Sequence, residues 1–163
     1  MKNKKLTHPF NPIIFNDSKI LILGSFPSIN SFNNSFYYGH KRNQFWKILL
    51  TITNYPINNI DQKIWLLKRS KIALWDMVKE CSRENSLDNS LEDIEVNSIA
   101  SLLENYPTIE KIAFTGRLAQ RLYKIHFDYL DIETLYLPSP SSAYAKMSLD
   151  KKIEIYRNRL EVN

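Results

Sequence analysis

The chain has 163 residues, of which 44% are hydrophobic and 12% aromatic, and it carries 22 lysines and arginines against 17 aspartates and glutamates. This length corresponds to one ordinary domain with its own core, and the composition is too apolar for a disordered chain. No apolar run approaches the roughly 20 residues of a membrane-spanning helix. The single cysteine, Cys81, excludes an internal disulfide and any metal site built from several cysteines. We expect Cys81 to be buried and the protein to be cytoplasmic.

Four short apolar runs are predicted as strands. Each is continuous rather than alternating, which is typical of strands covered on both faces in a parallel sheet. They are KILIL at Lys19–Leu23, KIALW at Lys71–Trp75, KIAFT at Lys111–Thr115 and ETLYL at Glu133–Leu137.

Helical patterns lie between and after these runs. The predicted helices are Gln44–Thr51, Asp61–Arg69, Glu95–Leu103, Leu118–Ile125 and a last helix that Ser148 caps and that runs to about Leu160. Asp150 falls in the first turn of the last helix, where a carboxylate is favourable. Strands that alternate with helices predict an α/β fold with helices on both faces of the sheet.

Ligands of such folds bind beyond the carboxyl ends of the strands, so the loops after the strands hold the candidate site. These loops are Gly24–Arg42, Asp76–Asp93, Gly116–Arg117 and Pro138–Met147, and the first two are long enough to indicate function. None of them contains G-x-G-x-x-G, a P-loop or a G-x-S-x-G elbow, which argues against a Rossmann dehydrogenase, a P-loop NTPase and an α/β-hydrolase. The two long loops hold no residue set with metal-ligand spacing, so we expect no metal site.

Three segments carry side chains suited to nucleic acid. GSFPS at Gly24–Ser28 lets the backbone approach a ligand closely. FYYGHKRNQFW at Phe36–Trp46 combines aromatic rings with cations, which suits base stacking and phosphate binding. LPSPSS at Leu137–Ser142 offers serine hydroxyls to phosphate oxygens.

Each of these features also has a structural explanation. Asn43 precedes a helix and is a favoured N-cap residue. Phe45 and Trp46 are expected in the core, and Tyr37 and Tyr38 could simply pack the loop. Taken singly, the motifs indicate only a small α/β domain with a rim that could bind a base or a phosphate.

Together, however, the motifs resemble the uracil-DNA glycosylase superfamily, and within it the hypoxanthine-DNA (deoxyinosine) glycosylase branch. The combination of GSFPS with YYGH-x-x-N-x-FW is specific, and the matching segments cover most of the chain in the family's order. They are His8–Ser28, Phe36–Trp46, Leu74–Asp76, Cys81–Ser90, the turn at Gly116 and Leu137–Ala143. The resemblance implies a three-layer α/β/α sandwich with a central four-stranded, mainly parallel sheet, in a single domain over residues 1–163.

The resemblance also implies roles for individual residues. In most of the superfamily, an Asp or Asn after the first strand orients the attacking water, but Phe26 occupies that place here. In the similar branch the asparagine of an HPxN motif takes this role, which points to Asn43 as the catalytic residue. Tyr38 falls where an aromatic ring stacks on the extruded base, and Ser25 and Phe26 would complete the base pocket.

DNA contacts are implied for polar residues of the first and last loops. The candidates are Ser28, His40, Arg42, Ser139 and Ser141. Two departures from the family pattern bear on these loops: Lys41 replaces the proline of HPxN, and Ser141 stands where classical uracil enzymes insert a leucine. The implied protein is a monomer located with the nucleoid in the cytoplasm, and it needs no metal or other cofactor.

The function that follows is a monofunctional DNA glycosylase of base excision repair, which removes a deaminated base, hypoxanthine or uracil, flipped out of double-stranded DNA. Two alternatives stay open. One is a mismatch-specific uracil-DNA glycosylase with little action on hypoxanthine. The other is a catalytically silent nucleic-acid-binding domain of the same fold.

Overall fold

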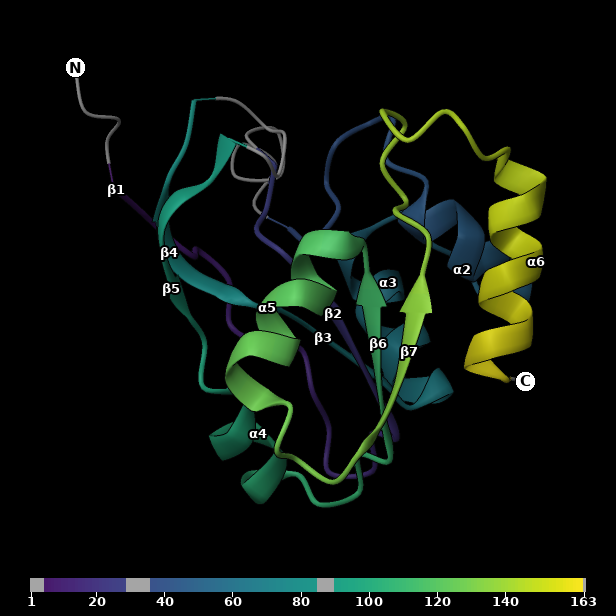
Figure 1. Cartoon of the computed structure of the whole chain (residues 1–163). Coiled ribbons are helices and arrows are strands. Elements are labelled where there is room, and N and C mark those ends of the chain that lie inside the picture. The colour runs from purple at the N-terminus through teal and green to yellow at the C-terminus, as the bar shows by residue number, and fades with distance from the viewer. Residues whose placement is uncertain (1–4, 29–35, 85–89, 163) are drawn as a thin grey trace.

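Four parallel strands form the central sheet of the computed structural model, which describes residues 5–28, 36–84 and 90–162 (Figure 1). In the order β3-β2-β6-β7 they are β3 (Ile72–Asp76), β2 (Ile20–Gly24), β6 (Lys111–Thr115) and β7 (Glu133–Leu137). All four predicted strands are confirmed within one residue. Because each neighbouring pair is parallel, the four carboxyl ends lie at one edge of the sheet.

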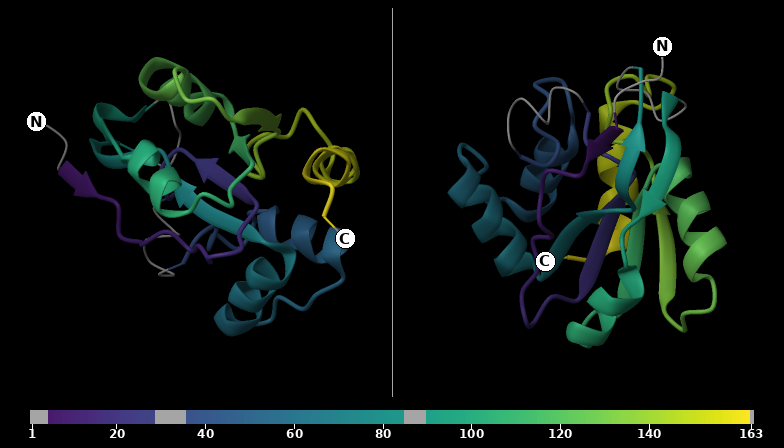
Figure 2. Two further views of the ribbon diagram at one scale, coloured as in Figure 1. Left: turned by 90° about the horizontal axis from the view of Figure 1, so that it is seen from below. Right: turned by 90° about the vertical axis from the view of Figure 1, so that its left-hand side faces the viewer.

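Helices cover both faces of this sheet, as Figure 2 shows. On one face lie α2 (Phe45–Thr53), α3 (Ile60–Ser70) and α6 (Leu149–Leu160); on the other lie α4 (Ile99–Asn105) and α5 (Arg117–Phe127). Along β2, Leu21 and Leu23 pack with α4 and α5, whereas Ile20 and Ile22 pack with the other three helices. The continuous apolar run therefore serves two cores, and the three-layer α/β/α prediction is confirmed.

Helix α6 begins as its sequence predicts. The Ser148 hydroxyl accepts a hydrogen bond from the Lys151 backbone N–H at 3.2 Å, and Asp150 lies in the first turn. Helix α3 has an equivalent cap, because the Asn59 side chain accepts from the Gln62 backbone N–H at 2.8 Å. Both caps satisfy a backbone donor that the helix itself leaves unpaired.

A second, antiparallel sheet was not predicted. It contains β1 (Lys5–Thr7), β4 (Val78–Ser82) and β5 (Glu92–Val96) in the order β1-β4-β5. The prediction of a helix over Glu95–Leu103 is therefore wrong at its start: Val96 pairs with Val78 in the sheet, and α4 begins only at Ile99. The error has a physical cause, because Val96 fits two patterns. Its spacing of three residues from Ile99 is that of one helix face, and its spacing of two residues from Ile94 is that of one strand face.

The second sheet brings the N-terminal segment to the carboxyl edge of the central sheet. The His8 backbone N–H donates to the Lys79 carbonyl at 2.7 Å, and Ile13 forms a bridge with Leu74. Cys81 of β4 is fully buried, as predicted. Parts of the predicted loops and of the Cys81–Ser90 motif, residues 29–35 and 85–89, lie outside the described residues. None of the helices described is long and apolar enough to cross a bilayer.

Candidate active site

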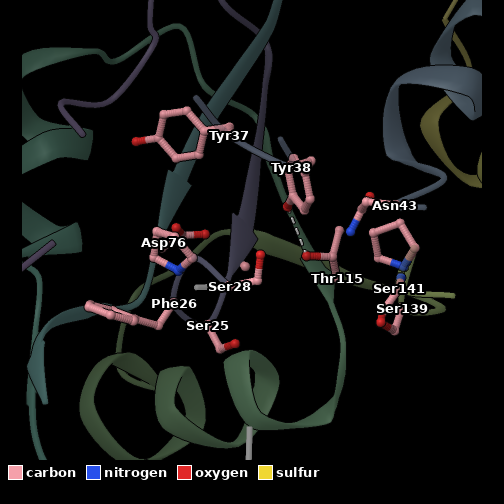
Figure 3. Close-up of a pocket in the computed structure, with 13 residues that line it drawn as sticks. Ser25, Phe26, Ser28, Tyr37, Tyr38, Asn43, Asp76, Thr115, Ser139 and Ser141 are labelled. Carbon is pink, nitrogen blue, oxygen red and sulfur yellow. Dashed lines mark hydrogen bonds between the residues drawn. The ribbon is translucent and has the colours of Figure 1, made fainter. Parts of the chain in front are cut away.

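A pocket lies at the carboxyl edge of the central sheet (Figure 3). Its volume of about 120 Å³ exceeds the roughly 10–15 Å³ that one water needs, so it can admit a larger group. The three segments that the sequence singled out meet here with the ends of two strands. The lining residues are 24–28, Tyr37, Tyr38, Asn43, Asp76, Thr115 and 139–141.

Most of the predicted site residues lie together in the wall of this pocket. The exceptions are His40 and Arg42, which do not line the pocket but form a turn just before Asn43. In that turn the Arg42 backbone N–H donates to His40 Nδ1 at 2.9 Å. The residues brought together are Ser25, Phe26, Ser28, Tyr38, Asn43, Ser139 and Ser141.

Asn43 lines the pocket and also supports the start of α2, although Gln44, and not Asn43 as expected, is the N-cap residue. Its backbone N–H donates to the His40 carbonyl at 2.9 Å, and its Oδ1 accepts from the Phe45 backbone N–H at 2.9 Å. Phe45 and Trp46, which follow, are buried as predicted. The hydrogen bond to Oδ1 fixes the amide, whose nitrogen points toward Tyr38 and Thr115 (Figure 3). Asn43 therefore serves the helix start and the pocket at once, since its bond to the first backbone N–H of α2 sets the orientation of the side chain.

Tyr38 is held in an unusual backbone conformation, with φ at 53°. One face of its ring stacks on Phe45, with ring centroids 3.9 Å apart and planes 19° apart. Its hydroxyl shares a hydrogen bond of 3.0 Å with Thr115 Oγ1. A positive φ is uncommon for a residue with a side chain and is found where packing enforces it, often at functional sites. These contacts make Tyr38 a fixed wall of the pocket.

Asp76 and Thr115 were not predicted as site residues. They are the last residues of β3 and β6, and Asp76 pairs with Gly24 at the end of β2. The side chain of Asp76 is 7% exposed, and its Oδ2 lies 2.7 Å from His8 Nε2. Asn97 holds the backbone of Asp76, because its Nδ2 donates to the Asp76 carbonyl at 2.8 Å. The position of each residue at a strand's carboxyl end was the signal that could have identified it.

Gly24 lies where three oxygen atoms converge. A Cβ at this position would be 2.5 Å from Asp76 Oδ1, 3.2 Å from the Tyr38 hydroxyl and 3.3 Å from Thr115 Oγ1. The first of these distances is shorter than any normal contact, so only glycine allows the carboxylate to approach the backbone this closely.

Tyr37, also not predicted, closes the pocket beside Asp76. Burial raises the pKa of Tyr37 far above its usual value, and the nearby Asp76 carboxylate raises it further. The phenol is therefore neutral, and its hydroxyl donates to the Asn11 carbonyl at 2.8 Å. Trp46 Nε1–H donates in turn to the Tyr37 carbonyl at 2.9 Å. Tyr37 thereby joins the N-terminal segment to the start of α2.

Helix α6 holds the loop after β7, which contains Ser139–Ser141, in place. Lys152, buried in α6, donates from Nζ to Gln44 Oε1 at 2.8 Å and to the Ser141 carbonyl at 3.2 Å. Burial lowers the pKa of Lys152. The Gln44 backbone N–H donates to the Pro140 carbonyl at 2.8 Å. Ser139–Ser141 and the segment that carries Asn43 are therefore held against each other.

Comparisons with known proteins agree with this geometry. Residues 12–161 match the family model of the uracil DNA glycosylase superfamily. A hypoxanthine DNA glycosylase from Methanosarcina acetivorans is 34% identical over 147 residues, which cover 89% of this chain and 92% of the relative. One from Methanosarcina barkeri is 33% identical over 145 residues, covering 88% and 91%.

A solved structure has the same fold. It is a solution NMR structure of a candidate uracil DNA glycosylase from Methanosarcina acetivorans, with a TM-score of 0.79 and 33% identity. The match covers 93% of this chain and 96% of that one. The resemblance seen in the sequence motifs is thus confirmed over nearly the whole chain. The chain belongs to the uracil DNA glycosylase superfamily.

Proposed function

We propose that this DNA glycosylase hydrolyses the N-glycosidic bond of a deaminated base, hypoxanthine or uracil, in double-stranded DNA during base excision repair. The observation that carries the proposal is the meeting of Asn43 with Gly24–Ser28 and Ser139–Ser141 in one pocket. The relatives named hypoxanthine DNA glycosylases support the choice of base.

The substrate nucleotide has to leave the duplex, because a base inside the stack is out of reach of a pocket. Unstacking costs a few kcal/mol and is least costly at a mismatch, which favours damaged sites. In the pocket the base would lie against the Tyr38 ring, whose other face Phe45 supports, and beside Ser25 and Phe26.

Asn43 is suited to position the attacking water. Its Oδ1 already accepts the Phe45 N–H, and a carbonyl oxygen has a second lone pair with which to accept from water. An amide is a weak base, but an oxocarbenium-like sugar, as in other glycoside hydrolyses, needs only a weakly activated water. The Asn43 NH2 group is left to donate to the base or to a neighbouring oxygen.

Asp76 is suited to distinguish deaminated bases from their parents. Hypoxanthine and uracil carry a proton on the ring nitrogen of the Watson–Crick edge, where adenine and cytosine present a lone pair. A carboxylate oxygen can only accept a hydrogen bond. It therefore favours the protonated ring nitrogen of hypoxanthine or uracil and repels the lone pair of adenine or cytosine. Guanine carries the same ring proton, so its rejection requires another part of the pocket.

DNA contacts are assigned to the rim of the pocket. Serine hydroxyls and basic side chains there would bind backbone phosphates and hold the duplex while the base is extruded. The proposed contacts are Ser28, His40, Arg42, Ser139 and Ser141. The chemistry requires no metal or other cofactor, and a monomer in the cytoplasm, close to the nucleoid, would suffice.

The test is a panel of labelled duplexes that carry hypoxanthine, uracil or xanthine opposite each normal base, followed by alkaline cleavage at abasic sites. We expect cleavage at hypoxanthine or uracil and none at adenine or cytosine. Cleavage confined to uracil in mismatches would favour the mismatch-specific alternative. Binding without cleavage of any substrate would overturn the proposal in favour of the silent domain.

A further inference from the structure

His8 lies directly behind the pocket, in a segment to which the proposed mechanism gives no role. Its side chain is 4% exposed, and Nε2 lies 2.7 Å from Asp76 Oδ2. Three aromatic rings surround the imidazole, with centroids 5.7 Å away for Phe10, 5.8 Å for Phe26 and 5.9 Å for Tyr37. A polar ring buried this deeply among aromatic rings has its position set by its hydrogen bonds.

Nε2 must be a donor, because its partner, the Asp76 carboxylate, can only accept, and the contacts of Nδ1 are compatible with this. Nδ1 lies 2.8 Å from the Phe10 carbonyl and 3.2 Å from the Phe10 backbone nitrogen. An imidazolium donates from Nδ1 to the carbonyl, and the neutral ring with its proton on Nε2 accepts the Phe10 N–H at Nδ1. In either form, Nε2–H donates to Asp76 Oδ2.

We infer that His8 is a positioning residue, which holds Asp76 Oδ2 so that Oδ1 is fixed at the pocket as the acceptor for the ring N–H of the extruded base. The inference rests on the proposed function. Oδ1 is the atom that would lie 2.5 Å from a Cβ on Gly24, beside the Tyr38 and Thr115 hydroxyls. With Oδ2 bound to His8 and the Asp76 carbonyl bound to Asn97, the carboxylate cannot turn away from the base.

The N-terminal segment keeps His8 in place. The His8 backbone N–H is bonded to Lys79 at the start of β4, and the Asn11 carbonyl accepts from the Tyr37 hydroxyl. Phe26 of the first loop packs edge-on against the imidazole, with the planes at 78°. The second sheet therefore has a use in recognition, because its strand β1 ends directly before His8 and its strand β4 holds the His8 backbone.

The experiment compares His8→Leu, which removes the donor, with His8→Gln, whose side-chain amide retains an N–H that can reach Oδ2. Lys5→Ala is the matched control: it breaks the surface ion pair with Glu80, 2.6 Å long, in the same segment and away from the pocket. Single-turnover rates on hypoxanthine-containing and adenine-containing duplexes are measured for each variant. Affinity for an undamaged duplex and the thermal midpoint are measured in parallel.

We expect His8→Leu to lower the hypoxanthine rate at least roughly tenfold, as loss of a supporting partner does at other sites, with affinity for undamaged DNA unchanged. His8→Gln should recover most of the rate, and Lys5→Ala should match the native protein. In an Asp76→Asn background, His8→Leu should cost little more, because His8 acts through Asp76. A native rate in folded His8→Leu, or equal losses in the Leu and Gln variants, would overturn the inference. Inactivity of the native protein on every base would instead overturn the proposed function.

Discussion

Gly24 has no room for a side chain, because oxygen atoms of Asp76, Tyr38 and Thr115 surround the place that a Cβ would take, and Asp76 Oδ1 would be only 2.5 Å from it. Of these, Asp76 has the least freedom to move, since His8 holds its carboxylate and Asn97 its carbonyl. The arrangement links a structural requirement to a chemical one. The close approach that only glycine permits is also what places Asp76 Oδ1 in the pocket.

Gly24→Ala should therefore abolish most activity and lower the unfolding free energy by about 1–3 kcal/mol, the usual cost of overpacking. Gly116→Ala is the matched control. Gly116 has φ at 118°, which strains any other residue, but a Cβ there would meet nothing within 4 Å. Urea denaturation should show a loss of stability in both variants, and the single-turnover rate should collapse only for Gly24→Ala. A native rate in Gly24→Ala would contradict the tight packing around Asp76.

At the scale of elements, α6 keeps the last loop in shape. Lys152 donates to the Ser141 carbonyl, the Tyr156 hydroxyl donates to the Pro138 carbonyl at 2.6 Å, and Arg159 donates to the Tyr136 carbonyl. Lys152 also reaches Gln44, one residue after Asn43. A helix on one face of the sheet thereby sets the spacing between the proposed catalytic residue and the proposed DNA-binding serines.

Lys152→Ala should lower the unfolding free energy by about 2 kcal/mol, through lost packing and unpaired acceptors, and should weaken DNA binding. The slope of log affinity against log salt should stay unchanged, because Lys152 touches no phosphate. Arg42→Ala should instead reduce that slope by roughly 0.9. Lys151→Ala is the control for Lys152→Ala. Among the described residues the Lys151 ammonium makes one exposed ion pair, with Glu154, so its loss should change little. A reduced salt slope in Lys152→Ala would place that lysine on the DNA.

At the scale of the whole molecule, both cores bury tyrosines. Tyr37 and Tyr156 belong to the core beneath α2, α3 and α6, and Tyr123 belongs to the core beneath α4 and α5. Burial raises the pKa of Tyr123 to about 12 and that of Tyr156 well above its usual value. The Tyr123 hydroxyl has no hydrogen-bond partner among the residues that the structure describes.

Alkaline pH should therefore destabilise the protein. Unfolded tyrosines ionise near pH 10, whereas native Tyr123 keeps its proton to about pH 12. Between these values the native state binds more protons, so the unfolding free energy falls as pH rises. Tyr123→Phe should make this fall shallower and should add about 1 kcal/mol at neutral pH by removing an unsatisfied hydroxyl. Urea denaturation across this pH range is the measurement, and an unchanged pH dependence would contradict the raised pKa.

The sequence predicted those parts of the fold whose signals are local. Lys111–Thr115 and Glu133–Leu137 have the bounds expected, and Ser148 caps α6, because apolar runs and caps depend on neighbouring residues. Val96 was misassigned because its partner, Val78, is distant in sequence. The motifs predicted that Asn43 and both serine-containing loops belong to one site, and the structure brings them together in one pocket. They gave no signal for the contact between Asp76 and His8, which forms only when β3 and the N-terminal segment meet across 68 positions of the chain.

The central claim concerns Asn43, and the most direct test is the single-turnover rate of Asn43→Ala on a hypoxanthine-containing duplex. Loss of the hydrogen bond to the Phe45 N–H costs about 1 kcal/mol of stability, so Asn59→Ala, which removes the cap of α3 away from the pocket, is the matched control. We predict a rate at least roughly tenfold lower for Asn43→Ala, with DNA affinity nearly intact, and a native rate for Asn59→Ala. Equal, near-native rates in the two variants would contradict the claim.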